Sequence, residues 1–370
     1  MGLPLVIVCD WIPPAFGAVG QYQDRRARMR AAEGNVAVLI GLGSRAEVLQ
    51  EGSLTIVRLA AVRPPPKASM ARRALWAINN SRRLLAEVGR AVGKLPEGEV
   101  EILVTGSPPF LAYLVILANR FFWRRTVIYR ITDFYPETLF ATGHLRWLKP
   151  LQGLFHALRR GADRIESLGD DQTRRLVETG FPLERIVLAR DDSPIKDWSR
   201  RTPVARPYPD DKVTLLYSGN LGLAHELETF CAAYEQHVVQ GSNRVRLWMN
   251  GQGARVADLV AFCEARGLPL HVTPPAAIED LPEVLRAGDA HLVLLKDPFW
   301  GYVLPSKIYA CLELETPIVY VGPPESDLHA LLTRHEFPWF HARAGDVDEC
   351  QRLLETLADT VLAKRKKARR

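Results

Sequence analysis

The sequence predicts an α/β protein built from two doubly wound domains, and three observations lead to this prediction. Apolar, β-branched runs of strand length alternate with helix-length segments along the chain of 370 residues. The runs are continuous, which is typical of parallel strands covered on both faces. One stretch rich in proline and charge, "SPIKDWSRRTPVARPYPDDK" at 193–212, separates two halves that each show the alternation.

The elements of each half follow in order along the chain. The N-terminal half opens with the strand "LPLVIVCD", a glycine-bearing loop and the helix-like "QYQDRRARMRAAEG". Its further strands are "NVAVLIG", "VEILVTG" and "TVIYRIT", with an apolar helix after Ser107. The C-terminal half has helices from about Glu226 and from Arg255, and the strands "VTLLYSGNLG", "VRLWMNGQG", "LHVT", "AHLVLL" and "PIVYV". Strands that alternate with helices imply right-handed parallel crossovers.

We therefore expect a chain of five segments. An N-terminal Rossmann-like domain at 1–195 precedes a linker at 196–212 and a second Rossmann-like domain at 213–345. A C-terminal helix at 346–363 and a basic tail at 364–370 complete the chain.

The composition is that of a soluble globular protein of a reducing compartment. Hydrophobic residues make up 47% and charged residues 24% of the chain. The five cysteines are odd in number and form no CxxC, which argues against a disulfide framework or a zinc cage. The N-terminal run lacks a basic n-region, and the longest apolar segment is too short to cross a bilayer. A cytoplasmic protein is expected.

Charge is divided unevenly along the chain. Residues 1–198 hold 28 Lys and Arg against 20 Asp and Glu, residues 199–363 hold 14 against 22, and the tail adds 6 positive charges. This asymmetry suggests different partners for the two halves. Nucleic acid is not expected, because no zinc-finger or RRM-type motif and no aromatic ladder accompanies the basic residues. We expect the basic half and the tail to bind the inner face of the cell membrane peripherally, through its anionic lipids. A solvated tail that only aids solubility is the alternative.

Glycine-bearing loops follow the predicted strands in both halves. "PPAFGAVG" and "TGSPP" lie in the first half, and "SGNLG" and "NGQG" lie in the second. Doubly wound sheets bind ligands at the carboxyl ends of their strands, and glycine permits close approach of the backbone. Matching loops in two halves therefore predict a ligand held between domains that face each other across a cleft.

A further helix begins "LPSKIYACLE", with Pro305, Ser306 and Lys307 at its start. Proline suits the first turn of a helix. The free N–H groups of a helix start favour an anion, and a hydroxyl and an ammonium group would add to that preference. A cap serine and a solvated lysine are the alternative.

Five segments, in this order, resemble the segments of a known family. They are "PPAFGAVGQ", "DFYPETLFATG", "ADRIESLGDDQTRRLVETGFPLERIVLARDD", "YSGNLGLAHELET" and "LPSKIYACLELETPIVYVGPPESD". They resemble the GT-B-fold glycosyltransferases of family 4, particularly the bacterial branch that builds surface polysaccharides and lipid-linked glycans. The resemblance implies retaining transfer of a sugar from a nucleotide-sugar donor, bound mainly by the second domain. The acceptor would be a glycan or a polyprenyl-linked sugar, held mainly by the first domain.

The resemblance also implies a donor site without a metal or other cofactor. Ser306 and Lys307 would neutralise the pyrophosphate as charge builds on the leaving nucleotide, which makes Lys307 a catalytic candidate. Backbone N–H groups of two loops would meet the same phosphates. These loops contain Gly219, Asn220 and Leu221 in the second domain, and Gly17 and Gly20 in the first.

The chain departs from the family pattern at several positions. By position from Pro305, the family's two glutamates fall on Trp300 and Tyr309. The family's basic residues after the first strand of the second domain are missing, so Lys307 is expected to carry more of the phosphate charge. The remaining donor-binding candidates are Glu226, Gly251, Gly253 and Tyr309.

Two further comparisons with the family concern a metal requirement and the position of the C-terminal helix. No DxD-like pair follows a strand of the second domain, and Asp191 and Asp192 lie before the linker, so activity is expected to survive a chelator. In the family the final helix commonly crosses back to the N-terminal domain, and 346–363 is long enough to do so.

Asp133 is the second catalytic candidate, because it opens "DFYPE" after a strand and could accept a hydrogen bond from the acceptor hydroxyl. A turn or N-cap aspartate is the alternative. Glu137 is expected to be structural and to pair with an arginine. The apolar helix and its aromatic end, "FFWRR" at 121–125, are either packed on the sheet or form an interfacial face.

Three functions remain open at this point. The leading one is a nucleotide-sugar glycosyltransferase at the cytoplasmic membrane face. A GT-B-fold sugar-nucleotide epimerase would need carboxylates and a histidine that converge in the cleft. The third is a two-domain binding protein, such as a catalytically degenerate transferase, which the missing glutamates would suit.

Overall fold

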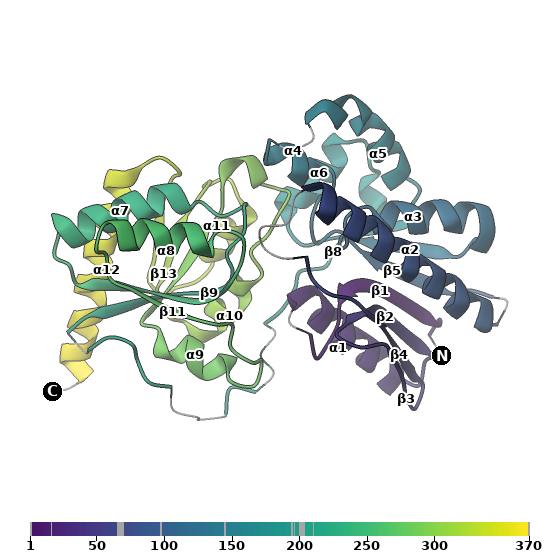
Figure 1. The fold of residues 1–370 in the computed structure, drawn as a ribbon, viewed down its shortest axis with the longest axis horizontal. Helices are drawn as coiled ribbons and strands as arrows, with labels where there is room; N and C mark the ends of the chain where they lie inside the picture. The colour runs from purple at the N-terminus through teal and green to yellow at the C-terminus, as the bar shows by residue number, and fades with distance from the viewer. Residues whose placement is uncertain are drawn as a thin grey trace. The chain divides into compact units, whose positions relative to one another are not determined.

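The chain folds into two compact units (Figure 1), as described by a computed structural model that covers residues 2–15, 17–64, 70–96, 98–143, 146–193, 195, 197–199, 204–209 and 211–368. Unit 1 comprises Met1–Asp191 with Gly301–Leu304, and unit 2 comprises Asp192–Trp300 with Pro305–Arg370. The first change of unit lies close to the end predicted for the N-terminal domain at 195, and the linker predicted at 196–212 belongs to unit 2.

Unit 1 is built on an eight-stranded sheet of order β3-β4-β2-β1-β5-β6-β7-β8, in which β3 pairs antiparallel with β4 and the other pairs are parallel. Its strands are β1 (Leu5–Trp11), β2 (Ala37–Gly43), β3 (Glu47–Glu51), β4 (Leu54–Ala60), β5 (Glu101–Thr105), β6 (Thr126–Arg130), β7 (Arg164–Ser167) and β8 (Ile186–Leu188). Its helices are α1 (Ala18–Ala32), α2 (Met70–Lys94), α3 (Leu111–Ala118), η1 (Asn119–Trp123), α4 (Glu137–Ala141), η2 (Arg146–Leu151), α5 (Gln152–Arg159), α6 (Asp170–Glu178) and η3 (Leu183–Arg185).

Both faces of the unit 1 sheet are buried, as the continuous apolar runs predict. Val6 and Val8 of β1 belong to a core shared with residues of α2 and α3. Leu5 and Ile7, which point to the opposite face, pack in a second core with Ala27 of α1. The strands predicted in this half are thereby confirmed as β1, β2, β5 and β6, whereas β3, β4, β7 and β8 are additions.

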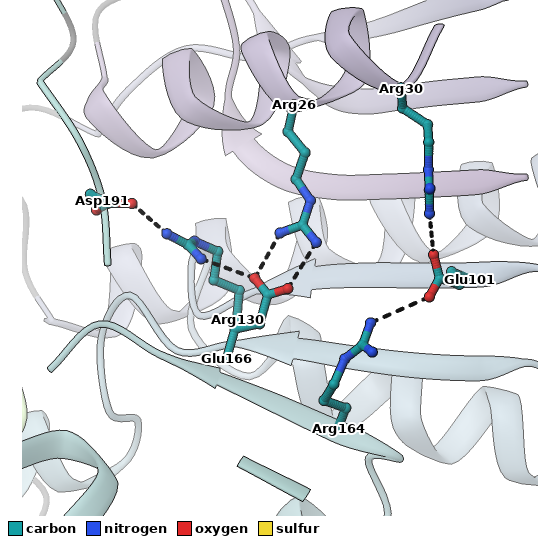
Figure 2. Close-up of polar contacts among 7 residues, drawn as sticks. All are labelled: Arg26, Arg30, Glu101, Arg130, Arg164, Glu166 and Asp191. Carbon is teal, nitrogen blue, oxygen red and sulfur yellow. Dashed lines mark hydrogen bonds and ion pairs between the residues drawn. The ribbon is translucent and has the colours of Figure 1, made fainter. Parts of the chain in front are cut away.

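Ionic contacts fasten α1 to the unit 1 sheet (Figure 2). Arg26 of α1 forms two hydrogen bonds, of 2.7 and 2.8 Å, to the carboxylate of Glu166 in β7. Arg130, the last residue of β6, donates to the same carboxylate at 2.9 Å. A second cluster in the same view joins Arg30 of α1 to Glu101 and Arg164.

Unit 2 is built on a six-stranded, all-parallel sheet of order β11-β10-β9-β12-β13-β14. Its strands are β9 (Val213–Asn220), β10 (Val245–Gln252), β11 (Leu270–Thr273), β12 (Ala290–Leu294), β13 (Ile318–Val321) and β14 (Trp339–Ala342). Its helices are α7 (Leu227–Val239), α8 (Val256–Ala265), α9 (Leu281–Ala287), η4 (Asp297–Phe299), α10 (Lys307–Leu314), α11 (Asp327–Leu332) and α12 (Val347–Ala368). The five strands predicted in this half are confirmed, and β14 is an addition.

The C-terminal helix differs from the prediction in length. α12 continues to Ala368, into the residues predicted to form a separate basic tail, and its Cys350, Leu354 and Leu357 lie in the core of unit 2. Arg365 forms an ion pair with Asp289 at 2.5 Å and donates a hydrogen bond to the carbonyl oxygen of Lys212 at 2.8 Å, and both partners belong to unit 2. The described part of α12 therefore packs on unit 2, and contact of this helix with the N-terminal half stays a prediction.

Candidate functional site

The predicted donor site lies at the carboxyl ends of β9, β10 and β12, where loops leave the unit 2 sheet. Parallel pairing of β9 with β10 continues to the strand ends and sets Gly251 opposite Gly219. A Cβ at Gly251 would stand 1.9 Å from the carbonyl oxygen of Gly219, and one at Gly253 would stand 2.2 Å from that of Leu221. The backbone after β10 therefore lies so close to the backbone at the end of β9 that only glycine fits at 251 and 253, and this contact explains both glycines without a ligand.

Gly219 and Leu221 differ in what they offer to a ligand. The α-carbon of Gly219 faces open space, and its φ of 133° suits glycine. In contrast, the Leu221 N–H donates to the carbonyl oxygen of Gln252 at 2.7 Å, and the Leu221 side chain is buried. The prediction that Leu221 presents its N–H to phosphates is wrong for this conformation, because β10 already uses that donor.

The loop between β9 and α7 uses several of its own polar groups. The Gly222 N–H donates to Nδ1 of His225 at 2.9 Å, and burial lowers the pKa of His225 to about 3. Asn220 is exposed, and its carbonyl oxygen accepts from the Tyr217 hydroxyl at 3.0 Å. The Asn220 side chain thus stays a candidate for ligand contact.

Glu226 caps α7. Its Oε1 accepts hydrogen bonds from the Thr229 N–H at 3.2 Å and from the Thr229 hydroxyl at 2.8 Å, and the residue is buried. An N-cap carboxylate satisfies helix N–H groups that have no partner within the helix. The structure therefore gives Glu226 a stabilising role, and donor binding by Glu226 remains a prediction.

The start of α10 holds Ser306 and Lys307. Ser306 occupies the N-cap position, and its hydroxyl makes no capping hydrogen bond. Lys307 does not extend into solvent: its Nζ is buried, has no hydrogen-bond partner among the described residues, and lies 3.0 Å from the centroid of the Tyr217 ring. Burial places the pKa of Lys307 well below its ordinary value. Tyr309 follows on the same helix and is half-buried.

A polar network that the sequence did not suggest lies at the same edge of the sheet. Ser218 donates to Oδ1 of Asn250 at 3.0 Å, and Asn250 donates to the Thr273 hydroxyl at 2.9 Å and to the carbonyl oxygen of Pro274 at 2.7 Å. This network joins the ends of β9, β10 and β11. Its only signal in the sequence is a polar residue at the end of three successive apolar runs.

In unit 1, Asp133 lies just beyond β6 and forms an isolated antiparallel bridge with Val303. Burial raises the pKa of Asp133 to about 6, and the negative charge of Asp10 adds to this effect. Asp10, near the end of β1, accepts a hydrogen bond of 2.8 Å from Ser107. The carboxylate of Asp10 therefore acts on that of Asp133 at the carboxyl edge of the unit 1 sheet. The sequence identified Asp133 and missed Asp10, although Asp10 also ends an apolar run.

The glycine loop after β1 is fixed by packing within unit 1. A Cβ at Gly20 would stand 1.8 Å from the carbonyl oxygen of Trp11, so α1 can approach β1 this closely only with glycine. Gly17 is the N-cap residue of α1 and has no such contact. Phosphate binding by Gly17 and Gly20 remains a prediction.

Glu137 is structural, as predicted, and its partner is Arg159. The two side chains are almost fully buried and lie 2.9 Å apart. Arg159 also donates to the carbonyl oxygen of Tyr135 at 3.0 Å. The pair thereby holds the loop that begins at Asp133.

The described residues contain no group of three or more His, Cys, Asp or Glu side chains that could hold a metal ion. Asp191, one of the pair before the linker, is 7% exposed and lies 2.5 Å from Arg130 (Figure 2). Its carboxylate charge is therefore already compensated by a guanidinium group.

The apolar helix predicted after Ser107 packs on the sheet, and only its aromatic end is exposed, so an interfacial face there stays a prediction. α3 is buried, as a packed helix requires, and Trp123 of η1 is packed against the same core. Phe121 and Phe122 are 67% and 80% exposed. Among the described residues, no helix is long and apolar enough to span a bilayer.

The sequence was compared with protein families and with known proteins. No family model matches the sequence. A segment of 159 residues is 27% identical to WcaI of Escherichia coli (strain K12), which is named as a glycosyl transferase of colanic acid biosynthesis. This match covers 40% of the chain and 37% of WcaI, so it spans little more than a third of that protein.

Solved structures resemble nearly the whole chain. A sucrose-phosphate synthase from Thermosynechococcus elongatus has a TM-score of 0.70 at 13% identity, over 99% of this chain and 98% of that one. An E. coli trehalose-6-phosphate protein bound with UDP-2-fluoro glucose has a TM-score of 0.68 at 13% identity, over 98% and 92%. WaaG, a glycosyltransferase involved in lipopolysaccharide biosynthesis, has a TM-score of 0.63 at 15% identity, over 97% and 91%. Two doubly wound units that match these structures end to end have the GT-B fold.

Proposed function

We propose that the protein is a glycosyltransferase that moves a sugar from a nucleotide-sugar donor to a glycan or lipid-linked acceptor, with retention at the anomeric carbon, in surface-polysaccharide biosynthesis. The observation that carries the proposal is the start of α10, where a buried lysine without an acidic partner among the described residues adjoins the carboxyl edge of a parallel sheet. Such an edge is where doubly wound folds bind nucleotides. The names of WcaI and WaaG and the UDP sugar bound in the trehalose-6-phosphate protein agree with this class of reaction.

The residues of each unit would have separate roles. In unit 2, the N–H groups at the start of α10, the Ser306 hydroxyl and the Lys307 amine would stabilise the leaving nucleoside diphosphate. In unit 1, Asp133 would accept a hydrogen bond from the acceptor hydroxyl, with Asp10 tuning its protonation. No step in this scheme requires a metal ion.

We further propose that unit 1 contacts anionic lipid through Phe121 and Phe122. These two exposed rings lie beside the exposed Arg120 and Arg124, and aromatic and cationic side chains together suit the headgroup region. Docking there would supply a lipid-linked acceptor without a membrane-spanning segment.

The test of the proposed reaction is product analysis with a panel of nucleotide sugars and lipid-linked acceptors. A transferase yields free nucleoside diphosphate and a glycosylated acceptor. An epimerised donor would indicate the epimerase, and binding without turnover would indicate a degenerate transferase. Either of those outcomes would overturn the proposal.

A further inference from the structure

The amine of Lys307 lies in an unusual environment for a lysine. Its Nζ is inaccessible to solvent and has no hydrogen-bond partner in the described part of the chain. It lies 3.0 Å from the centroid of the Tyr217 ring. The hydroxyl of Tyr217 donates a hydrogen bond to the carbonyl oxygen of Asn220. A surface lysine would have water at all three of its N–H positions.

Four titratable groups of the described residues are coupled to this amine or lie against it, and none of the four supplies a negative charge near neutral pH. They are Tyr217 of β9, His225 of the following loop, His291 of β12 and Cys311 of α10. Burial raises the pKa of Tyr217 and of Cys311, the latter to about 12, so both stay protonated. Burial lowers the pKa of His225 to about 3 and of His291 to about 4, so both stay neutral.

An ammonium group in this position would be a buried charge without compensation. Removing such a charge from water costs more than the face of one aromatic ring returns, and a lysine responds by releasing its proton. Burial accordingly holds the pKa of Lys307 well below its ordinary value. A neutral amine, however, cannot offset the charge of a diphosphate.

We propose that Lys307 is an uncharged amine in the free protein and that the nucleoside diphosphate part of the donor binds together with one proton at its Nζ. The inference rests on the proposed function, because it assumes that the anion binds beside α10. The proton passes from a buffer acid to the lone pair of Nζ, an N–H bond forms, and the buffer is left as its conjugate base. The arriving anion then compensates the ammonium that it creates.

Isothermal titration calorimetry of the full chain with UDP, and with the other nucleoside diphosphates, tests this proposal. Titrations at pH 7.5 to 8.5 in HEPES and in Tris buffer give the number of protons exchanged, because the buffers differ in ionisation enthalpy. A terminal phosphate has lost its proton well below this range, so the ligand contributes little to the count. We expect uptake of about one proton per nucleotide, and binding that weakens about tenfold for each pH unit.

Lys307→Met is the decisive variant, because it keeps the shape of the side chain and removes the titrating nitrogen. It should fold at least as stably as the parent chain, since the nitrogen that it removes makes no hydrogen bond. It should bind nucleotide with no proton uptake and without the tenfold pH dependence. Lys366→Met, on the exposed surface of α12, is the matched control and should behave as the parent does.

The possible results separate this inference from the proposed function. Nucleotide binding without proton uptake, or uptake that persists in Lys307→Met, would overturn the inference and leave the transferase standing. No binding of any nucleoside diphosphate would overturn the proposed function, and the inference with it. Proton uptake that is confined to chains with Lys307 supports both.

Discussion

The buried pair of Glu137 and Arg159 allows a prediction whose size can be worked out from the structure. Burial alone would raise the pKa of Glu137, but hydrogen bonding from His156 and the charge and hydrogen bonds of Arg159 lower it from 4.5 to about 2. A depression of this size corresponds to about 3 kcal/mol in favour of the folded state at neutral pH. Loss of one member of a buried ion pair costs a similar ~3–5 kcal/mol, because the other charge stays uncompensated. Glu137→Gln should therefore destabilise unit 1 by about 3 kcal/mol.

The assay is hydrogen–deuterium exchange combined with guanidinium unfolding. Peptides from β6 and α5 report on unit 1, so the loss can be assigned to the correct unit. Glu178→Gln is the matched control: it removes a surface partner of Arg175, in a pair for which we expect less than ~0.5 kcal/mol. A loss below ~1 kcal/mol for Glu137→Gln would refute the reasoning, because the pair would then contribute no more than a surface pair does.

The same pair predicts a dependence on pH. The folded-state pKa of Glu137 is depressed, so its contribution is complete above the unfolded pKa of about 4.5 and is lost as pH falls towards about 2. The stability difference between the parent chain and Glu137→Gln should thus be constant from pH 7 to 5 and shrink below pH 4.5. A difference that does not change down to pH 3 would contradict the assignment.

The remaining predictions concern activity and membrane binding. Lys307→Met should lower turnover at saturating donor by roughly a hundredfold, the scale of one lost transition-state contact, and unchanged turnover would contradict its role. Activity should rise with pH through about 6 as Asp133 ionises. Asp133→Asn should abolish this limb and Asp10→Asn should move it to lower pH, whereas a limb unmoved by either variant would exclude Asp133. Replacing Phe121 and Phe122 by aspartate should reduce sedimentation with anionic vesicles and leave nucleotide binding intact; equal sedimentation would exclude this face. Turnover should persist in EDTA, and its loss with recovery on adding magnesium would refute the metal-free scheme.

The fold could be predicted from the sequence because the central strands of both sheets are buried on two faces. Runs such as Leu5–Trp11 and Val213–Asn220 therefore read as continuous apolar strands. The antiparallel β3 could not be predicted in this way, because all five of its residues are partly or fully exposed and only Val48 and Leu49 are apolar. The length of α12 could not be predicted either, because its basic end has the composition of a solvated tail. In the structure Arg365 of this end pairs with Asp289.

The candidate site was only partly predictable, because the sequence reports residue types and not their hydrogen-bond partners. Gly219 and Gly251 look alike in the sequence, because each is a glycine at the end of an apolar run. In the structure Gly219 faces open space, whereas the contact between β9 and β10 requires glycine at 251. Leu221 and Glu226 stand at the predicted positions, but a strand and a helix cap already use their polar groups. The burial of the Lys307 amine had no counterpart in the sequence, because it depends on how α10 packs against β9.

Incubation of the full chain with each nucleotide sugar and a polyprenyl-linked acceptor, followed by mass spectrometry of the nucleotide and by mass spectrometry and NMR of the glycosylated lipid, tests the central claim most directly. The account predicts equal amounts of free nucleoside diphosphate and glycosylated lipid for one donor, with the anomeric configuration of that donor retained, and a rate that falls sharply in Lys307→Met. Release of nucleotide without a glycosylated product, or transfer at an undiminished rate in Lys307→Met, would contradict it.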